Sequence, residues 1–395
     1  MDGITNIPKR KLRCFINSNA PWSTSGYGNA SRQFLPQLRD AGFPLAMCPF
    51  YGLEGGVLDI NGIRMYPKIQ SAWGEDAMVV HANKWGSDVV ISNQDVWVLD
   101  PNWLKQIKRW IAHCPIDHNP APKAVVDRLR LCYRIISYTK FGKKALENEG
   151  LYSTYIPLTV ETDIMKPLDK AKYRDKFHIP QDLFMFGMIA ANKDNPARKS
   201  FQECMDAFKL FHDEHPKSGI YFGTLLQQQG GFPIMDYAGF LGIQNNVYHI
   251  EPYHQMFSLD SQAIAEIYNT FDCYLAPSAH EGFGMTIVEA QSCGLPVITN
   301  DWVCMPELII PGKTGLLTKV GLKWFSHLYS YWGIPSVQSI YERMEEVFVA
   351  DRAKMGKAGR EYVVKEYDSQ TVFKNKWMPF LDAVEADIYP EPKSP

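Results

Sequence analysis

The sequence predicts an α/β protein with two parallel-sheet domains. Short apolar runs that resemble buried strands alternate with amphipathic, helix-like segments along the chain. This alternation is typical of parallel sheets with helices on both faces. A length of 395 residues suits two domains. A polar stretch, 160–181, contains Pro167 and Pro180 and separates two similar alternating blocks, so it is the best linker candidate.

The first block predicts six strands and two helices. The expected strands are 12–17, 45–50, 88–92, 110–114, 134–138 and 155–157. Helix 30–41 is amphipathic and ends at Gly42, and helix 141–149 ends at Gly150.

The second block repeats the pattern. Its expected strands are 184–190, 219–224, 247–250, 271–277 and 295–299. Its expected helices are 201–212, 262–270, 285–293, 340–348, 354–366 and 370–384. The Pro-rich tail, 389–395, is expected to be disordered.

Composition and charge exclude several classes of protein. Hydrophobic residues make up 46% of the chain and charged residues 21%, as in ordinary soluble globular proteins. A net charge of −2 gives no overall attraction to nucleic acid or to an anionic membrane. The eight cysteines are scattered without a C-x-x-C pair, which disfavours a zinc knuckle and indicates a reducing compartment. Without a signal-peptide core or an 18-residue apolar run, a cytoplasmic protein with no transmembrane segment is expected.

The most informative segment is 278–300, SAHEGFGMTIVEAQSCGLPVITN. It places Glu281 and Glu289 eight residues apart, with a Gly-Phe-Gly turn after the first and a predicted helix around the second. A helix N-terminus after such a turn offers free N–H groups and partial positive charge, which suit a phosphate. A carboxylate two turns into the helix can accept hydrogen bonds from the vicinal hydroxyls of a sugar. Together these features indicate a nucleotide sugar as ligand.

This segment resembles the donor-site signature of retaining glycosyltransferases of the GT-B fold, family 4 (glycosyl transferases group 1). Segment 305–317, MPELIIPGKTGLL, resembles the part of the family pattern that follows it. The resemblance implies two Rossmann-like domains facing across a cleft, with the C-terminal helix crossing back to the first. The expected domains are 1–165 on the acceptor side, 166–365 for the donor, and 366–395 as crossover helix and tail on the first domain.

The resemblance assigns donor contacts to the signature. Glu289 is expected to hold the ribose hydroxyls. Glu281, with the backbone of Gly282, Phe283 and Gly284, is expected to hold the sugar and to be a catalytic residue. Separately from the resemblance, the position of His280 directly before Glu281 suggests that it contacts sugar hydroxyls or backbone.

Segment 193–199, KDNPARK, resembles the Arg/Lys pair that neutralises the diphosphate leaving group in this family. The match is best at Lys199, with Arg198 and Lys193 as further candidates. Positioned cations stabilise the negative charge that grows on a departing diphosphate. The alternative is a solvated basic loop.

Loop 23–31, STSGYGNAS, lies between the first strand and the first helix. Gly26 and Gly28 allow a backbone to approach a ligand closely, and the resembled family covers the donor diphosphate with this loop. A dinucleotide fingerprint is disfavoured because its third glycine is Ser31 here and because strand 45–50 ends without a ribose-binding acid. The alternative is a surface loop without a ligand.

Segment 110–122, WIAHCPIDHNPAP, ends a strand with two histidines and a carboxylate. The family often places a His or Asp here, near the C6 hydroxyl of the sugar and the reacting centre. Asp117 and His118 are therefore candidate catalytic residues, ranked above His113, which is expected to face the core. Each has the alternative of a hydrogen-bonded structural role. A zinc site at His113 and His118 is disfavoured because Pro115 breaks the helical register between them.

The predicted chemistry is retaining transfer of a sugar from a nucleotide-diphosphate sugar, with UDP or GDP most favoured, to a hydroxyl acceptor. No D-x-D motif occurs, so neither a metal nor a cofactor is expected. A glycosidase is disfavoured because eight helical residues span about 12 Å, beyond the usual separation of paired carboxylates. The acceptor class stays open between a glycan, a lipid-linked sugar and a modified DNA base, and the oligomeric state is also open. Two alternatives remain: another GT-B chemistry such as nucleotide-sugar epimerase or phosphorylase, and a non-catalytic nucleotide-sugar-binding protein.

Overall fold

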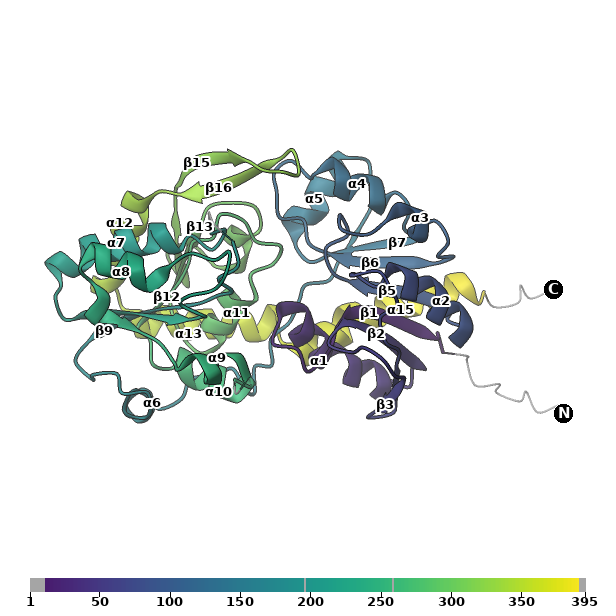
Figure 1. The fold of residues 1–395 in the computed structure, drawn as a ribbon, viewed down its shortest axis with the longest axis horizontal. Coiled ribbons are helices and arrows are strands. Elements are labelled where there is room, and N and C mark those ends of the chain that lie inside the picture. Colours follow the sequence, from purple (N-terminus) through teal and green to yellow (C-terminus); the bar gives the residue numbers. More distant parts are fainter. Residues whose placement is uncertain (1–10, 195–196, 258, 391–395) are drawn as a thin grey trace. The chain divides into compact units, whose positions relative to one another are not determined.

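The computed structural model describes residues 11–194, 197–257 and 259–390. The chain divides into two compact units (Figure 1). The first unit takes Met1–Cys114, Asp127–Ile136 and Val372–Pro395, and the second takes Pro115–Val126 and Ser137–Thr371, so far as these ranges are described. The expected domain limits at 165 and 365 remain a prediction.

The first sheet has eight strands in the order β3-β4-β2-β1-β5-β6-β7-β8. Its strands are β1 (Cys14–Asn19), β2 (Leu45–Tyr51), β3 (Leu58–Ile60), β4 (Ile63–Met65), β5 (Val89–Asn93), β6 (Trp110–Cys114), β7 (Arg134–Ser137) and β8 (Thr154–Tyr155). Its connections hold α1 (Gly26–Asp40), α2 (Glu75–Trp85), α3 (Pro101–Leu104), α4 (Lys123–Leu129) and α5 (Lys140–Asn148). Strand β1 pairs in parallel with β2 on one side and β5 on the other, so the strand order reverses at β1.

The second sheet has six parallel strands in the order β11-β10-β9-β12-β13-β14. They are β9 (Phe184–Ile189), β10 (Ser218–Gly223), β11 (Val247–Tyr248), β12 (Cys273–Ala276), β13 (Val297–Asn300) and β14 (Gly315–Thr318). The helices of this part are α6 (Lys170–Lys176), α7 (Phe201–Glu214), α8 (Ile234–Leu241), α9 (Pro252–Phe257), α10 (Ser261–Tyr268), α11 (Met285–Ser292), α12 (Val337–Val349) and α13 (Arg352–Glu366). Helices lie on both faces of the sheet (Figure 1). Numbered within this sheet, the strand order is 3-2-1-4-5-6, that of a Rossmann-like domain.

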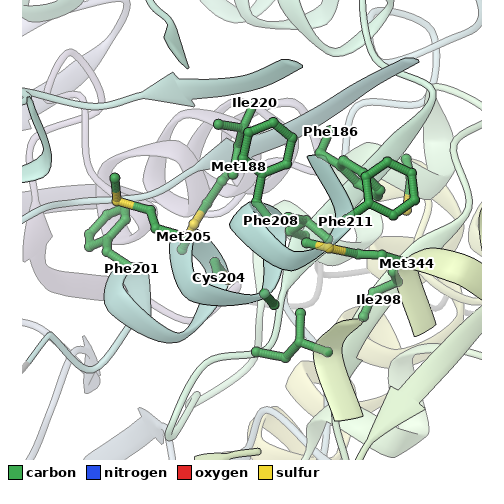
Figure 2. Close-up of a cluster of buried hydrophobic side chains, with 14 of the residues drawn as sticks. Phe186, Met188, Phe201, Cys204, Met205, Phe208, Phe211, Ile220, Ile298 and Met344 are labelled. Carbon is green, nitrogen blue, oxygen red and sulfur yellow. The ribbon is translucent and has the colours of Figure 1, made fainter. Parts of the chain in front are cut away.

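A cluster of buried aromatic and sulfur-containing side chains holds α7 on the second sheet (Figure 2). Phe201, Met205, Phe208 and Phe211 follow the helical repeat, so they share the face that packs toward Phe186 of β9. Burying one such ring fully contributes about 2–3 kcal/mol. This packing fixes the start of α7, directly after the predicted cation segment.

The predicted crossover helix is confirmed. Its segment forms α14 (Ser369–Val372), a π-helical turn (Phe373–Trp377) and α15 (Met378–Ile388). In the first unit, the Trp377 ring lies 4.3 Å from that of Phe34, and Arg134 pairs with Asp387 at 2.6 Å. The Trp377 ring also meets that of His113 at 5.1 Å, so His113 is a buried core residue.

Two segments differ from expectation. The polar stretch expected as a linker contains α6, which Asp169 caps, and Arg174 of α6 pairs with Asp272 at 2.7 Å within the second unit. Residues after β14, for which no element was predicted, form an antiparallel hairpin of β15 (Val320–Phe325) and β16 (Tyr331–Pro335). Across the described ranges, none of the helices combines the length and apolar character needed to cross a bilayer.

Candidate functional site

The candidate site of the second unit lies where its strand order reverses. Strands β9 and β12 are neighbours there, and the helices that follow them start from loops at their carboxyl ends. Ligands of open α/β sheets bind outside the carboxyl ends of strands at such a point. The loop after β9 carries Arg198 and Lys199, and the loop after β12 carries Glu281.

Glu281, Arg198 and Lys199 form an ion cluster in which Glu281 is buried and Arg198 is partly exposed. Glu281 is 7% exposed; one of its oxygens pairs with the Lys199 ammonium, and the other lies 3.4 Å from Arg198 Nη1. The backbone joins the loops as well, because Ala279 N donates to Arg198 O at 2.7 Å. The structure therefore brings together the carboxylate predicted for the sugar and two of the cations predicted for the diphosphate.

The cluster sets the ionisation of its members. Burial alone would raise the pKa of Glu281, but the charges of Lys199 and Arg198 outweigh it and lower the pKa to about 2. Burial and the Arg198 charge lower the pKa of Lys199, although Glu281 opposes this. Glu281 is therefore ionised at neutral pH and can accept hydrogen bonds but not donate a proton.

Lys193 is not part of this cluster. Its residue is exposed, and within the described part of the chain it makes no hydrogen bond or ion pair with Glu281, Arg198 or Lys199. Two residues of its segment, 195 and 196, lie outside the described residues.

Packing shapes the Gly-Phe-Gly turn. A Cβ on Gly282 would overlap the side chain of Pro115, and Gly284 has φ +99° where α11 begins. Phe283 is 3% exposed, and its ring lies 5.7 Å from that of Tyr367. The Phe283 side chain therefore belongs to the core, which leaves its backbone as the part available to a ligand.

Glu289 lies on α11 and is 7% exposed. Tyr268, at the end of α10, donates its hydroxyl hydrogen to Glu289 Oε2 at 2.9 Å. This bond orients the carboxylate. Sequence reasoning missed Tyr268 because no motif marks it, and the ribose role of Glu289 remains a prediction.

Asp117 bridges two histidines. Its Oδ1 lies 2.6 Å from His118 Nδ1, and its Oδ2 lies 3.0 Å from His280 Nδ1. Burial would raise the pKa of Asp117, but hydrogen bonds from His118 and His280 hold it well below its usual range. On the far side of His118, Trp332 Nε1 donates to His118 Nε2 at 2.6 Å. Sequence reasoning missed Trp332, which lies on the unpredicted hairpin.

The same three residues also offer a possible ligand set for a metal. Atoms of Asp117, His118 and His280 lie within 4.8 Å of one another. A metal on Nδ1 of neutral His118 would leave a proton on Nε2, facing the indole N–H of Trp332 across 2.6 Å. Two donors cannot share that contact, so the residues fit a hydrogen-bonded chain and do not fit a metal site. A second group, Glu214, His215 and Glu345, contains a hydrogen bond in which His215 Nε2 lies 3.0 Å from Glu345 Oε1.

The glycine loop of the first unit lies at the strand-order reversal of its own sheet. Ser25 caps α1 by accepting from Gly28 N at 3.0 Å, which explains why this helix starts earlier than predicted. A Cβ on Gly28 would overlap Ser23, so this glycine lets the loop close on itself. Gly26 is exposed at the helix start. Phosphate binding by this loop remains a prediction.

Comparison with known proteins supports the predicted resemblance. Residues 240–324 match the family described as Glycosyl transferases group 1. The chain is 23% identical to the capsular polysaccharide biosynthesis glycosyltransferase CapM of Staphylococcus aureus, over 52% of this chain and 48% of CapM, so it spans about half the length of that relative.

Solved structures share the fold. Sucrose-phosphate synthase from Thermosynechococcus elongatus superposes with a TM-score of 0.75 at 17% identity, over 95% of this chain and 100% of that one. Anabaena HepE in complex with UDP and glucose gives a TM-score of 0.67 at 15% identity, over 94% and 100%. The predicted GT-B fold, with two Rossmann-like parallel-sheet domains, is confirmed.

Proposed function

We propose that the protein is a retaining glycosyltransferase that moves a sugar from a nucleotide-diphosphate sugar to a hydroxyl acceptor without a metal. The observation that carries the proposal is the cluster of Glu281, Arg198 and Lys199 at the strand-order reversal of the second sheet. The cluster combines fixed cations with an ionised acceptor, as a diphosphate attached to a hydroxylated ring requires.

The start of α7 supports a ligand beside the cations. Ser200, at the N-cap, has φ +57°, a left-handed conformation that is strained for a residue with a side chain. Its hydroxyl is buried and has no hydrogen-bond partner among the described residues. An anion at this helix N-terminus would meet free N–H groups and the charges of Arg198 and Lys199.

In this proposal, Glu289 binds the hydroxyls of the ribose. The Tyr268 hydroxyl donates a hydrogen bond to one oxygen of the Glu289 carboxylate and so orients the group. An ionised carboxylate can accept from two vicinal hydroxyls at once. Gly26 and Gly28 of the first unit would cover the diphosphate.

The proposed chemistry uses the charge balance of the cluster. A bound diphosphate would share Lys199 and Arg198 with Glu281, and Glu281 would then accept hydrogen bonds from the sugar. The acceptor oxygen forms a bond to the anomeric carbon on the face from which the nucleotide leaves, while the bond from carbon to phosphate oxygen breaks. The acceptor proton passes to a phosphate oxygen, and Arg198 and Lys199 stabilise the charge on the leaving diphosphate. Asp117 and His118 would lie near the reacting centre.

The relatives favour one donor to test first. The Anabaena HepE structure contains UDP and glucose, so UDP-sugars are the first donors to test and GDP-sugars the second. The acceptor stays open between a glycan, a lipid-linked sugar and a modified DNA base. The cytoplasmic location also remains a prediction.

The experiment measures nucleoside-diphosphate release from UDP-, GDP-, ADP- and TDP-sugars by the wild type and by Glu289→Ala. We expect slow hydrolysis of one donor, and nucleotide binding about 10- to 100-fold weaker in the variant, because a charged hydrogen bond is lost. Glu361→Ala is the matched control, since Glu361 is an exposed glutamate on α13. An unchanged dissociation constant in Glu289→Ala would refute the ribose assignment. Isomer formation without an acceptor would favour an epimerase, and donor binding without turnover would favour a binding protein.

A further inference from the structure

The hairpin of β15 and β16 is fixed beside the segment that leads into Glu281. Gly333 N of β16 donates to Ala279 O at 2.9 Å, and Asn300 Nδ2 donates to Gly333 O at 2.6 Å. The neighbouring Trp332 is thereby placed against His118 and His280, and its ring stacks on that of His280 at 4.4 Å with 25° between the planes.

The hydrogen bonds of this group have only one consistent direction. An indole N–H can only donate, so His118 Nε2, 2.6 Å from Trp332 Nε1, must be the acceptor. Neutral His118 then carries its proton on Nδ1 and donates it to Asp117 Oδ1. The Asp117 carboxylate can only accept, so His280 Nδ1 donates to Oδ2 at 3.0 Å.

This series of hydrogen bonds therefore ends in a lone pair on His280. Burial lowers the pKa of His280 and so favours its neutral ring, which with its proton on Nδ1 has an acceptor at Nε2. His280 is 7% exposed, and its Nε2 is buried without a hydrogen-bond partner in the described part of the chain. Buried acceptors in folded proteins nearly always have a partner, so an unpaired one beside a candidate site requires a donor from a ligand or a water molecule.

The surroundings of His280 select the chemistry of that ligand. The next residue, Glu281, is an ionised carboxylate, so two hydrogen-bond acceptors stand side by side in the sequence. A group that fills the place beside His280 Nε2 must donate a hydrogen bond, which a carbonyl or an ionised phosphate oxygen cannot do. A hydroxyl group can, and the proposed donor carries hydroxyls on the sugar expected beside Glu281.

We infer that His280 Nε2 accepts a hydrogen bond from a hydroxyl of the transferred sugar, and that Trp332, acting through His118 and Asp117, is a positioning residue for it. This inference rests on the proposed function, because it requires a sugar beside Glu281. It makes His280 a specificity residue for sugars that keep the hydroxyl. A site with a buried acceptor discriminates strongly against an analogue that lacks the matching hydroxyl.

The test separates sugar binding from nucleotide binding. Dissociation constants of the donor found in the panel, and of its free nucleoside diphosphate, are measured for the wild type, His280→Asn, His280→Gln and Trp332→Phe. Asparagine can keep the bond to Asp117 but has no atom in place of Nε2, whereas glutamine offers an acceptor oxygen at similar reach. His178→Asn is the control, since His178 is exposed and its φ of +55° suits asparagine.

We expect His280→Asn to bind the free nucleoside diphosphate as the wild type does and the sugar nucleotide about 3- to 10-fold more weakly. His280→Gln should recover part of this loss. Sugar nucleotides that lack one sugar hydroxyl extend the test. One of these deoxy analogues should bind the wild type more weakly than the full sugar nucleotide does. The same analogue and the full sugar nucleotide should bind His280→Asn equally well. Trp332→Phe keeps the stacking but loses the N–H, so it should shift the ¹⁵N signals of His118 and weaken only sugar binding.

Equal sugar binding by His280→Asn and wild type would overturn the inference. A parallel loss of nucleotide and sugar binding would also overturn it, because that pattern indicates a structural role. A wild-type protein that binds no nucleotide would instead refute the proposed function, so the two failures are distinguishable.

Discussion

Glu281 shows how far neighbouring charges can override burial at a single residue. A carboxyl group with 7% exposure would ordinarily resist ionisation, yet Lys199 and Arg198 hold its pKa at about 2. The lowered pKa of Lys199 means that the pair as a whole contributes less stability than the shift of Glu281 alone suggests. The cluster is therefore better suited to receiving an anion than to stabilising the fold.

The shift of Glu281 gives a pH prediction. Because its folded pKa lies below the ordinary 4.5, its contribution is present above pH 4.5 and is lost as the pH falls through about 2. We compare the free energy of unfolding of wild type and Glu281→Gln in urea at pH 7, 5 and 3.5. Glu281→Gln should be less stable by about 3 kcal/mol at pH 7, because it leaves Lys199 buried without its partner.

The difference in the free energy of unfolding between wild type and Glu281→Gln should decrease by about 1.4 kcal/mol for each pH unit below 4.5. Asp117, whose pKa is also lowered, is present in both proteins and cancels in the comparison. A difference in the free energy of unfolding that stays constant from pH 7 to pH 3.5 would contradict the ionised, paired state of Glu281.

At the residue scale, sequence reasoning assigned roles to single residues but did not predict which of those residues contact one another. It assigned Glu281 to the sugar and Lys199 to the diphosphate as separate roles, but the structure pairs them. It ranked Asp117 and His118 together, yet could not place His280 on the same carboxylate, because that contact joins positions 163 residues apart. Trp332 lay in no motif, so only the fold brought it to His118.

At the element scale, the prediction followed the strength of the apolar pattern. Strand β6 matches its predicted range, and β2 and β9 differ from theirs by one residue, because each is a buried apolar run. Helix α6 was missed because its composition is polar, although Asp169 caps it. The hairpin was missed because its exposed aromatic side chains, such as Trp324 and Phe325, do not alternate with polar ones as in a half-buried strand.

Two helix glycines give a matched prediction at this scale. A Cβ on Gly356 of α13 would overlap the backbone of Gly294, which follows α11, whereas a Cβ on Gly239 of α8 would meet nothing within 4 Å. Gly356→Ala should therefore lower the free energy of unfolding by about 2 kcal/mol or more, through overpacking. Gly239→Ala should raise it by about 0.5–1 kcal/mol, because alanine favours the helix.

Urea unfolding followed by circular dichroism measures both glycine variants under the same conditions. Equal effects of the two substitutions would show that the close approach of α13 to the loop after α11 does not limit stability.

At the scale of the whole molecule, the first and the last described residues, 11 and 390, belong to the same compact unit. Trp377 in the returning C-terminal segment is 4% exposed and packs on Phe34 of α1 and His113 of β6. The first unit thus depends on residues more than 250 positions away from most of its sheet. Local sequence patterns predict the helix but not this packing, which the resemblance alone implied.

This dependence gives the last prediction. Trp377→Ala removes a buried ring from the first unit and should destabilise that unit by about 3–5 kcal/mol. For a unit of this size, the loss corresponds to a Tm about 10 °C lower in calorimetry. Trp73→Ala makes the same truncation in the same unit at a side chain that is 44% exposed, and it should change the Tm far less. The proposed nucleotide contacts other than Gly26 and Gly28 lie in the second unit, so the stabilisation of that unit by the nucleoside diphosphate should largely survive in Trp377→Ala. Loss of both the first-unit transition and the nucleotide response would show instead that the two units unfold as one cooperative body, with the C-terminal segment supporting both.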